Sequence, residues 1–211
     1  MHLVSQSLDF AFAHRADIAV ALRQHVALSA AAIAAASAIC LPLGVAASRR
    51  PWGRAVITGV NAVRVIPSLA LLAFVLPWLG LGFASALTAL IVLACPPILV
   101  NTDIAYRGVD PYAIEAARGM GMSDAQIVWR VQTPLALPVV FAGLRLASIE
   151  VVASATLATL IGAGGLGDII MAGLELEQPA ELLVGSLLAA LLAVAAAAAF
   201  SAGERLAVAR S

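Results

Sequence analysis

Five long apolar runs, separated by short polar intervals, divide this chain. They cover residues 26–48, 56–79, 84–105, 136–161 and 181–202. Each run exceeds the ~20 residues that an α-helix needs to cross the hydrocarbon layer of a bilayer. The pattern therefore predicts an all-α membrane protein with about five transmembrane helices, embedded in the lipid bilayer.

Residues 1–25 differ from these runs, because charged and histidine side chains are mixed there with apolar ones. This mixture predicts a separate N-terminal helix that lies in the membrane interface. A cleaved signal peptide is the alternative, since Gly44–Ser48 resembles a cleavage site. The apolar run before that site is too long for a signal peptide, and Arg49 and Arg50 follow it at once. An uncleaved first span is therefore favoured.

The composition agrees with a membrane protein, since 63% of the residues are hydrophobic and 11% are charged. Twelve basic residues, all of them arginine, balance twelve acidic ones, so no basic face predicts a nucleic-acid partner. The two cysteines, Cys40 and Cys95, lie inside apolar runs. Neither a disulfide nor a metal site is predicted from them.

The arginines orient the chain, because cytoplasmic loops of membrane proteins are enriched in Lys and Arg. With the N-terminus outside, the outer segments before residue 26 hold only Arg15 and Arg23. The cytoplasmic segments then hold Arg49, Arg50, Arg54, Arg107, Arg118, Arg130, Arg205 and Arg210. We therefore expect the N-terminus outside and the C-terminus, with a tail over residues 203–211, in the cytoplasm.

The polar interval over residues 110–134 begins with the signals of a short helix. Asp110 is a helix-capping residue, and Pro111 suits the first helical position. Gly119 and Gly121 then end this helix, since glycine adopts backbone angles that a helix does not contain.

A second short helix follows in the same interval. Ser123 and Gln126, three residues apart, form a capping box at its start. Pro134 is expected to end it. Two helices joined at a glycine predict a compact cytoplasmic elbow between two membrane spans.

The elbow also carries a family resemblance. Glu115-Ala116-Ala117, then Gly121, then residues 131–134 (Val-Gln-Thr-Pro) resemble the EAA signature of binding-protein-dependent ABC importer permeases. That signature is Glu-Ala-Ala, three residues, Gly, nine residues and Ile-x-Leu-Pro. Here valine stands where isoleucine is usual and Thr133 where leucine is usual. The resemblance implies a type I (MetI-like) permease fold in a bacterial inner membrane.

Further segments resemble one branch of these permeases, that of glycine betaine, carnitine and choline. They are residues 65–72 (VIPSLALL), 97–102 (PILVNT), 142–145 (AGLR) and 155–168, which ends in a glycine cluster. The similarity covers roughly residues 26–202. An ABC permease for an amino acid such as methionine is the alternative, because its glycine cluster is similar although its second span is not.

The resemblance also implies the partner subunits of this chain. Two permease subunits, identical or paralogous, would join two ATPase subunits that bind ATP and Mg²⁺, and an external substrate-binding protein. In the elbow, Glu115 would make polar contacts with the ATPase, and Ala116 and Ala117 would allow its close approach. Gly119, Gly121 and Pro134 would shape the bend. This chain has no P-loop and needs no cofactor or metal of its own; a scaffold that only recruits a partner is the rival hypothesis.

The translocation path is predicted from residues that are unusual in a membrane span. Pro67 removes a backbone donor, so the second span should kink beside Ser68, as a gate or as a purely structural bend. Arg64 and Glu150 both lie ~15–18 Å from the cytoplasmic side if each residue rises about 1.5 Å. Mutual pairing would offset the cost of burying them; otherwise Arg64 reaches toward water and Glu150 is protonated.

The glycine cluster is the last candidate, with Gly162, Gly164 and Gly165 assigned to the path or gate. Residues 162–167 match the GxGxxG pattern of dinucleotide sites, but a membrane helix precedes them where that site needs a strand. Residues 165–168 match the GxGD pattern of intramembrane aspartyl proteases, with Asp103 as the partner of Asp168. All three histidines precede the first predicted span, so we expect no buried histidine base.

Overall fold

A computed structural model describes residues 2–208 of the chain, and every regular element in that range is helical. Ten α-helices are joined by short turns and by three irregular helical segments. The α-helices are α1 (His2–Ala13), α2 (Arg15–Ser48), α3 (Gly53–Ala62), α4 (Ser68–Leu79), α5 (Phe83–Arg107), α6 (Pro111–Gly119), α7 (Asp124–Ile127), α8 (Thr133–Ala155), α9 (Leu166–Glu175) and α10 (Pro179–Val208). The irregular segments are η1 (Val63–Val65) and η3 (Thr156–Ile161), both 3₁₀ helices, and the π-helical η2 (Val128–Gln132).

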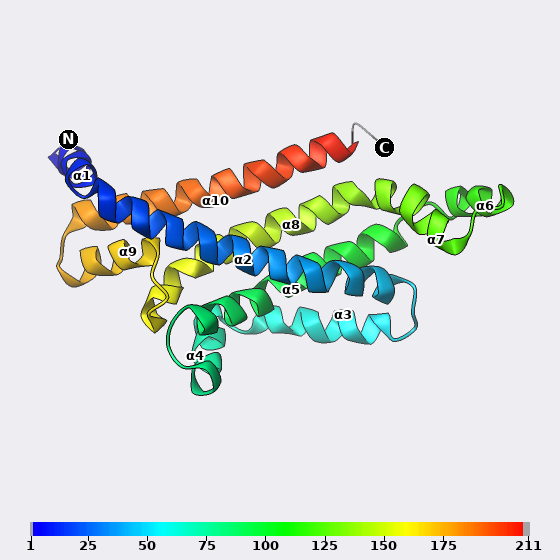
Figure 1. Cartoon of the computed structure of the whole chain (residues 1–211), viewed down its shortest axis with the longest axis horizontal. Coiled ribbons are helices and arrows are strands. Elements are labelled where there is room, and N and C mark those ends of the chain that lie inside the picture. Colours follow the sequence, from blue (N-terminus) through cyan, green and yellow to red (C-terminus); the bar gives the residue numbers. More distant parts are fainter. Residues whose placement is uncertain (1, 209–211) are drawn as a thin grey trace.

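The long helices α2, α5, α8 and α10 form the body of the molecule (Figure 1). α2 packs on α5, α5 on α8, and α8 on α10. α6 and α7 project from one end of this bundle, whereas α9 lies at the opposite end, near the N-terminus (Figure 1). The described ends of the chain also lie at opposite ends of the bundle (Figure 1).

Four helical stretches are long and apolar enough to cross a membrane, and the bent pair α3–η1 and α4 brings the number to five if it is one span. This confirms the predicted all-α fold. The first span differs from the prediction, because α2 starts at Arg15 and residue 25 is not a boundary. α10 likewise runs through to Val208 and includes most of the predicted tail. The predicted cytoplasmic Arg210 lies outside the described residues.

Small residues bring the central helices close together. A side chain on Gly44 of α2 would lie 2.6 Å from Cβ of Thr102 in α5. One on Gly143 of α8 would lie 2.9 Å from the backbone oxygen of Pro97 in α5. Without a hydrophobic force between helices in lipid, such close backbone approach is what stabilises the bundle.

One charged contact crosses the bundle where the sequence predicted none. Arg145 of α8 donates to Glu204 of α10 at 3.1 Å and to Ser201 at 3.3 Å. The last apolar run ends at residue 202, so Glu204 falls in the predicted tail. The helix continues for another turn and a half, and its glutamate pairs with an arginine that lies inside the fourth span.

Candidate functional site

The first half of the elbow has the predicted structure. The carboxylate of Asp110 accepts a hydrogen bond from the backbone N–H of Tyr112 at 2.9 Å, and Pro111 is the first residue of α6. The helix ends at Gly119, and the chain reverses at Gly121, whose φ of 80° lies in the left-handed region. A side chain at Gly121 would meet no neighbour, so the backbone angle alone requires glycine there.

The second half begins as predicted and ends differently. Ser123 and Gln126 form the complete capping box of α7, with bonds of 2.8 and 3.4 Å. The expectation that Pro134 ends this helix is wrong, because the chain continues through the π-helical η2 into α8. Pro134 lies in the first turn of α8, where a missing backbone N–H costs little. The elbow is therefore continuous with the fourth span.

The outward face of the elbow is formed by α6. Tyr112 and Met120 are 80% and 75% exposed, and Glu115, Ala116 and Gly119 are exposed as well. Ala117 is 1% exposed and packs inside the elbow, so it cannot offer the outward contact expected of it. Large apolar side chains beside one carboxylate give this face the composition of a protein-binding surface.

The base of the elbow is attached to three helices. Arg107, at the end of α5, pairs with Asp103 at 2.9 Å and donates to the backbone oxygen of Ala47 in α2 at 2.8 Å. The hydroxyls of Tyr106 in α5 and Thr133 in α8 lie 2.8 Å apart in a hydrogen bond. Because both ends of the elbow are anchored in this way, its displacement would move α5 and α8 directly.

The stretch predicted as the second span is interrupted at Pro67 rather than merely kinked. α3–η1 and α4 meet at an angle of 101°, and the exposed Pro67 caps α4 in front of the half-buried Ser68. Arg64 is exposed in η1, and Glu150 is half-buried in α8. Within residues 2–208 no ion pair joins these two side chains, although Arg64 is close enough to act electrostatically on Glu150.

The glycine cluster forms a turn between η3 and α9. Gly162, Gly164 and Gly165 all have positive φ, of 74°, 75° and 106°. Two neighbouring side chains of α2 hold this turn. The side-chain oxygen of Gln24 accepts from the N–H of Gly165 at 3.2 Å, and Nδ1 of His25 accepts from the N–H of Leu166 at 3.3 Å.

His25 corrects the expectation that no histidine is buried, since it is 1% exposed. Because its Nδ1 accepts a bond, Nε2 carries the proton and donates to the backbone oxygen of Val152 in α8 at 3.0 Å. Both ring nitrogens are thus used to join α2, α8 and α9. Gln24 and His25 were not predicted because the first span was expected to begin at residue 26, whereas α2 already begins at Arg15. A histidine next to an apolar run was the available signal.

The enzyme alternatives find no support in this geometry. Asp103 pairs with Arg107 at the elbow end of α5, whereas Asp168 of α9 accepts from Thr159 of η3 at the opposite end of the bundle. A shared proton between these carboxylates is therefore excluded in this structure. No strand precedes the glycine cluster in residues 2–208, and that part of the chain contains no group of three potential metal ligands.

Comparison with known proteins gives the same family throughout. Residues 24–208 match the family described as "Binding-protein-dependent transport system inner membrane component". The Carnitine transport permease protein OpuCB of Listeria monocytogenes is 44% identical over 81% of this chain and 79% of the relative. The Glycine betaine/carnitine/choline transport system permease protein OpuCB of Bacillus subtilis is 36% identical over 90% of this chain and 88% of its own.

A solved structure supports the fold. In the structure of inward facing conformations of the MetNI methionine ABC transporter, one chain superposes with a TM-score of 0.77 at 27% identity. The match covers 89% of this chain and 93% of the other.

Proposed function

The chain belongs to the binding-protein-dependent transport system inner membrane components, and on that premise we propose that its cargo is an osmoprotectant such as glycine betaine, carnitine or choline. It is a permease subunit of an ABC importer, a multi-pass protein of the bacterial inner membrane, and a transport component rather than an enzyme. The proposed cargo rests on the relatives. Their names specify carnitine, choline or glycine betaine, and their similarity to this chain covers most of its length.

The elbow is the observation that supports a coupling role. Its exposed face carries Tyr112, Glu115 and Met120, and its two ends continue into α5 and α8. In the proposed mechanism an ATPase binds this face, and closure of the ATPase on ATP and Mg²⁺ favours one orientation of the bundle. Such coupling is thermodynamic, since ATP shifts the equilibrium only by binding the complex better in one orientation.

The remaining partners belong to the same proposal. A second permease subunit, identical or paralogous, completes the path, and an external binding protein delivers the cargo. The elbow faces the cytoplasm, with the N-terminus outside and the C-terminus inside. The break at Pro67 and the glycine turn at residues 162–165 are the elements of the path that would move.

We assign high-affinity recognition of the cargo to the binding protein. A quaternary ammonium is usually held by an aromatic cage. Phe74 and Trp78 are 71% and 78% exposed on α4, while Phe141 and Phe200 are half-buried against the bundle core. The one ring contact within residues 2–208 joins Phe10 and His14. These aromatics supply no cage, so the path itself would be weakly selective.

The decisive experiment reconstitutes the permease with its ATPase and binding protein in vesicles. ATP hydrolysis should rise with binding protein loaded with glycine betaine, carnitine or choline, and uptake of that solute should accompany it. Stimulation by methionine alone would support the amino-acid alternative. Normal ATPase recruitment with neither stimulation nor uptake would support the scaffold hypothesis.

A variant of the elbow tests whether its exposed face binds the ATPase. Glu115→Lys reverses an exposed charge of α6 without changing buried contacts, so it should weaken co-purification of the ATPase. Asp9→Lys, an exposed charge reversal in α1, is the control. Equal ATPase recovery with Glu115→Lys would leave Glu115 an ordinary surface residue.

A further inference from the structure

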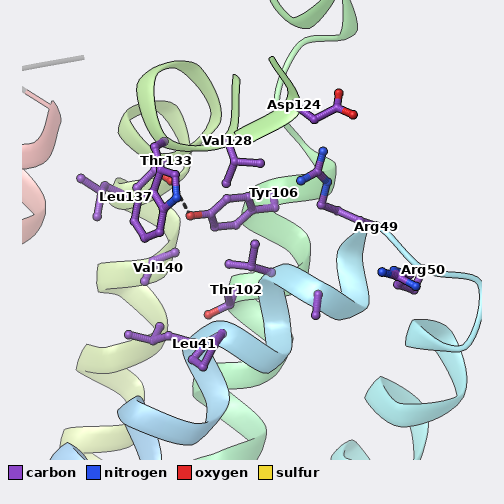
Figure 2. A pocket seen from close by; sticks show the side chains of 14 residues that line it. Leu41, Arg49, Arg50, Thr102, Tyr106, Asp124, Val128, Thr133, Leu137 and Val140 are labelled. Carbon is purple, nitrogen blue, oxygen red and sulfur yellow. Dashed lines mark hydrogen bonds between the residues drawn. The ribbon is translucent and has the colours of Figure 1, made fainter. Parts of the chain in front are cut away.

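A cavity of about 750 Å³ lies beside the base of the elbow, between α2, α5 and the start of α8 (Figure 2). Its volume is within the ~300–1,000 Å³ that ligand sites in proteins occupy. Most of its wall consists of apolar side chains. They are Leu41, Pro42, Val45, Val128, Leu137 and Val140.

The polar groups inside the cavity already have partners within the protein. The hydroxyl of Thr102 donates to the backbone oxygen of Ile98 at 2.7 Å, and Tyr106 bonds to Thr133, as the dashed line in Figure 2 shows. These hydroxyls are already engaged within the protein, and an occupant of the interior faces a mostly apolar wall. The interior favours a hydrocarbon chain.

The mouth of the cavity has the opposite character. Arg49 and Arg50 follow the end of α2 and line this mouth, and both are exposed (Figure 2). Within residues 2–208 neither guanidinium group makes a hydrogen bond or an ion pair. The acidic residue at the mouth, Asp124, is engaged by Arg118 at 3.3 Å. Two free positive charges at the mouth are complementary to an anionic group.

We propose that this cavity binds an anionic phospholipid, with an acyl chain between α2, α5 and α8 and the phosphate at Arg49 and Arg50. Basic pockets between membrane helices on the cytoplasmic side are suited to such headgroups. The cavity wall includes Val128 and Trp129 of η2, the segment that joins the elbow to α8. A bound lipid would therefore contact the joint through which the elbow moves, and the proposal does not depend on the cargo.

The test uses the assembled importer in vesicles that contain phosphatidylglycerol or phosphatidylcholine with a photoreactive group in the acyl chain. After illumination, mass spectrometry measures labelling of peptides that contain Leu41–Ala46 or Val128–Val140. Phosphatidylglycerol should label them more strongly than phosphatidylcholine. Replacing both Arg49 and Arg50 with Gln should reduce phosphatidylglycerol labelling by roughly 30-fold. Arg54→Gln, an exposed arginine outside the cavity lining, should leave it unchanged.

A second variant tests the cavity itself. Ala46 lines it but is exposed, so Ala46→Phe places a ring in the path of the acyl chain without overpacking the core, and Ala46→Ser is its matched control. Ala46→Phe should abolish labelling by both lipids, whereas Ala46→Ser should retain it. Equal labelling by the two lipids, or an Arg54→Gln effect as large as that of the double change, would overturn the proposal. So would unchanged labelling of Ala46→Phe, or competition by free glycerol phosphate, which would indicate a site for small anions.

Discussion

The elbow and the glycine turn lie at opposite ends of the bundle, and they are held in opposite ways (Figure 1). Within residues 110–127 of the elbow, each side-chain hydrogen bond joins residues two to six positions apart, such as Asp110 with Tyr112 and Arg118 with Asp124. In the turn, Gln24 and His25 hold residues 141 positions away. The elbow can therefore keep its shape while it moves as a unit. The turn keeps its shape only while α2 and α9 stay together.

The largest expected effect concerns the long-range contacts of the turn. His25→Phe keeps the ring but removes both hydrogen bonds, which leaves the buried N–H of Leu166 without a partner. A buried unsatisfied donor and the loss of the second bond should together cost about 3 kcal/mol of unfolding free energy. Unfolding of the purified subunit in mixed micelles, titrated with denaturing detergent, measures this loss.

His14→Phe is the matched control for that measurement. His14 is exposed and bonds only to the backbone oxygen of Phe10, four residues earlier. Its replacement should leave the unfolding free energy within about 0.5 kcal/mol of the original. If His25→Phe is as harmless as His14→Phe, long-range contacts do not hold the turn, and the contrast with the elbow fails.

Gly121→Val, in the elbow, should have a smaller effect on stability and a larger one on transport. A β-branched side chain at a φ of 80° costs about 1–3 kcal/mol of backbone strain, although no neighbouring atom obstructs it. We expect normal membrane insertion and abolished solute uptake in vesicles. Gly59→Ala in α3 is the control, because Gly59 has ordinary helical angles and equally open surroundings and lies outside the elbow. Normal uptake by Gly121→Val would remove the coupling role assigned to this bend.

The contrast also explains what could be predicted from the sequence. The caps at Asp110 and Ser123 and the reversal at Gly121 are local, so the residues that form them stand close together in the chain. Pro134 was misjudged because the same residue that ends one helix can begin another, and only the packing of α8 decides between these outcomes. The membrane fold was predictable because each span carries its own apolar signal.

The contacts that sequence analysis missed are those between distant segments. His25 and Gln24 meet the glycine turn only after α2 and α9 have packed, so no spacing in the chain indicates the contact. Glu204 was missed for a related reason, since its pairing with Arg145 depends on the register of α10 against α8. Ala117 was expected to make an outward contact because the EAA resemblance implies it, and only the packing of α6 shows that it is buried.

The capping box of the elbow offers a smaller test of local stabilisation. Ser123→Ala removes the acceptor of the 3.4 Å bond from Gln126 and should cost about 0.5–1 kcal/mol, since caps at exposed sites lie at the low end of the measured range. Hydrogen exchange of residues 124–127 should accelerate, whereas that of α9 should not change. Faster exchange in α9 as well would show that the two ends of the bundle are not independent.

The smallest expected effect concerns Arg64 and Glu150, two charged residues in different helices. They test whether charges on distant segments interact as the hydrogen bonds of the turn do. Glu150 stands two residues before Val152, whose backbone oxygen accepts from His25, so it is close to the long-range contacts of the turn. Yet no ion pair joins it to the exposed Arg64. Because the two side chains make no ion pair, we expect their coupling to be about 0.5 kcal/mol or less, within the small range of weak charge pairs.

A double-mutant cycle with Glu150→Gln and Arg64→Gln measures this coupling through the yield of assembled importer and its uptake rate. If the double variant merely sums the two single losses, the residues act independently and the predicted pair does not exist. Recovery in the double variant toward the original rate would instead indicate that the two charges meet in another orientation of the bundle. The contact between Arg64 and Glu150 would then form in only one orientation of the bundle. The hydrogen bonds of His25 would persist in both orientations and support the glycine turn.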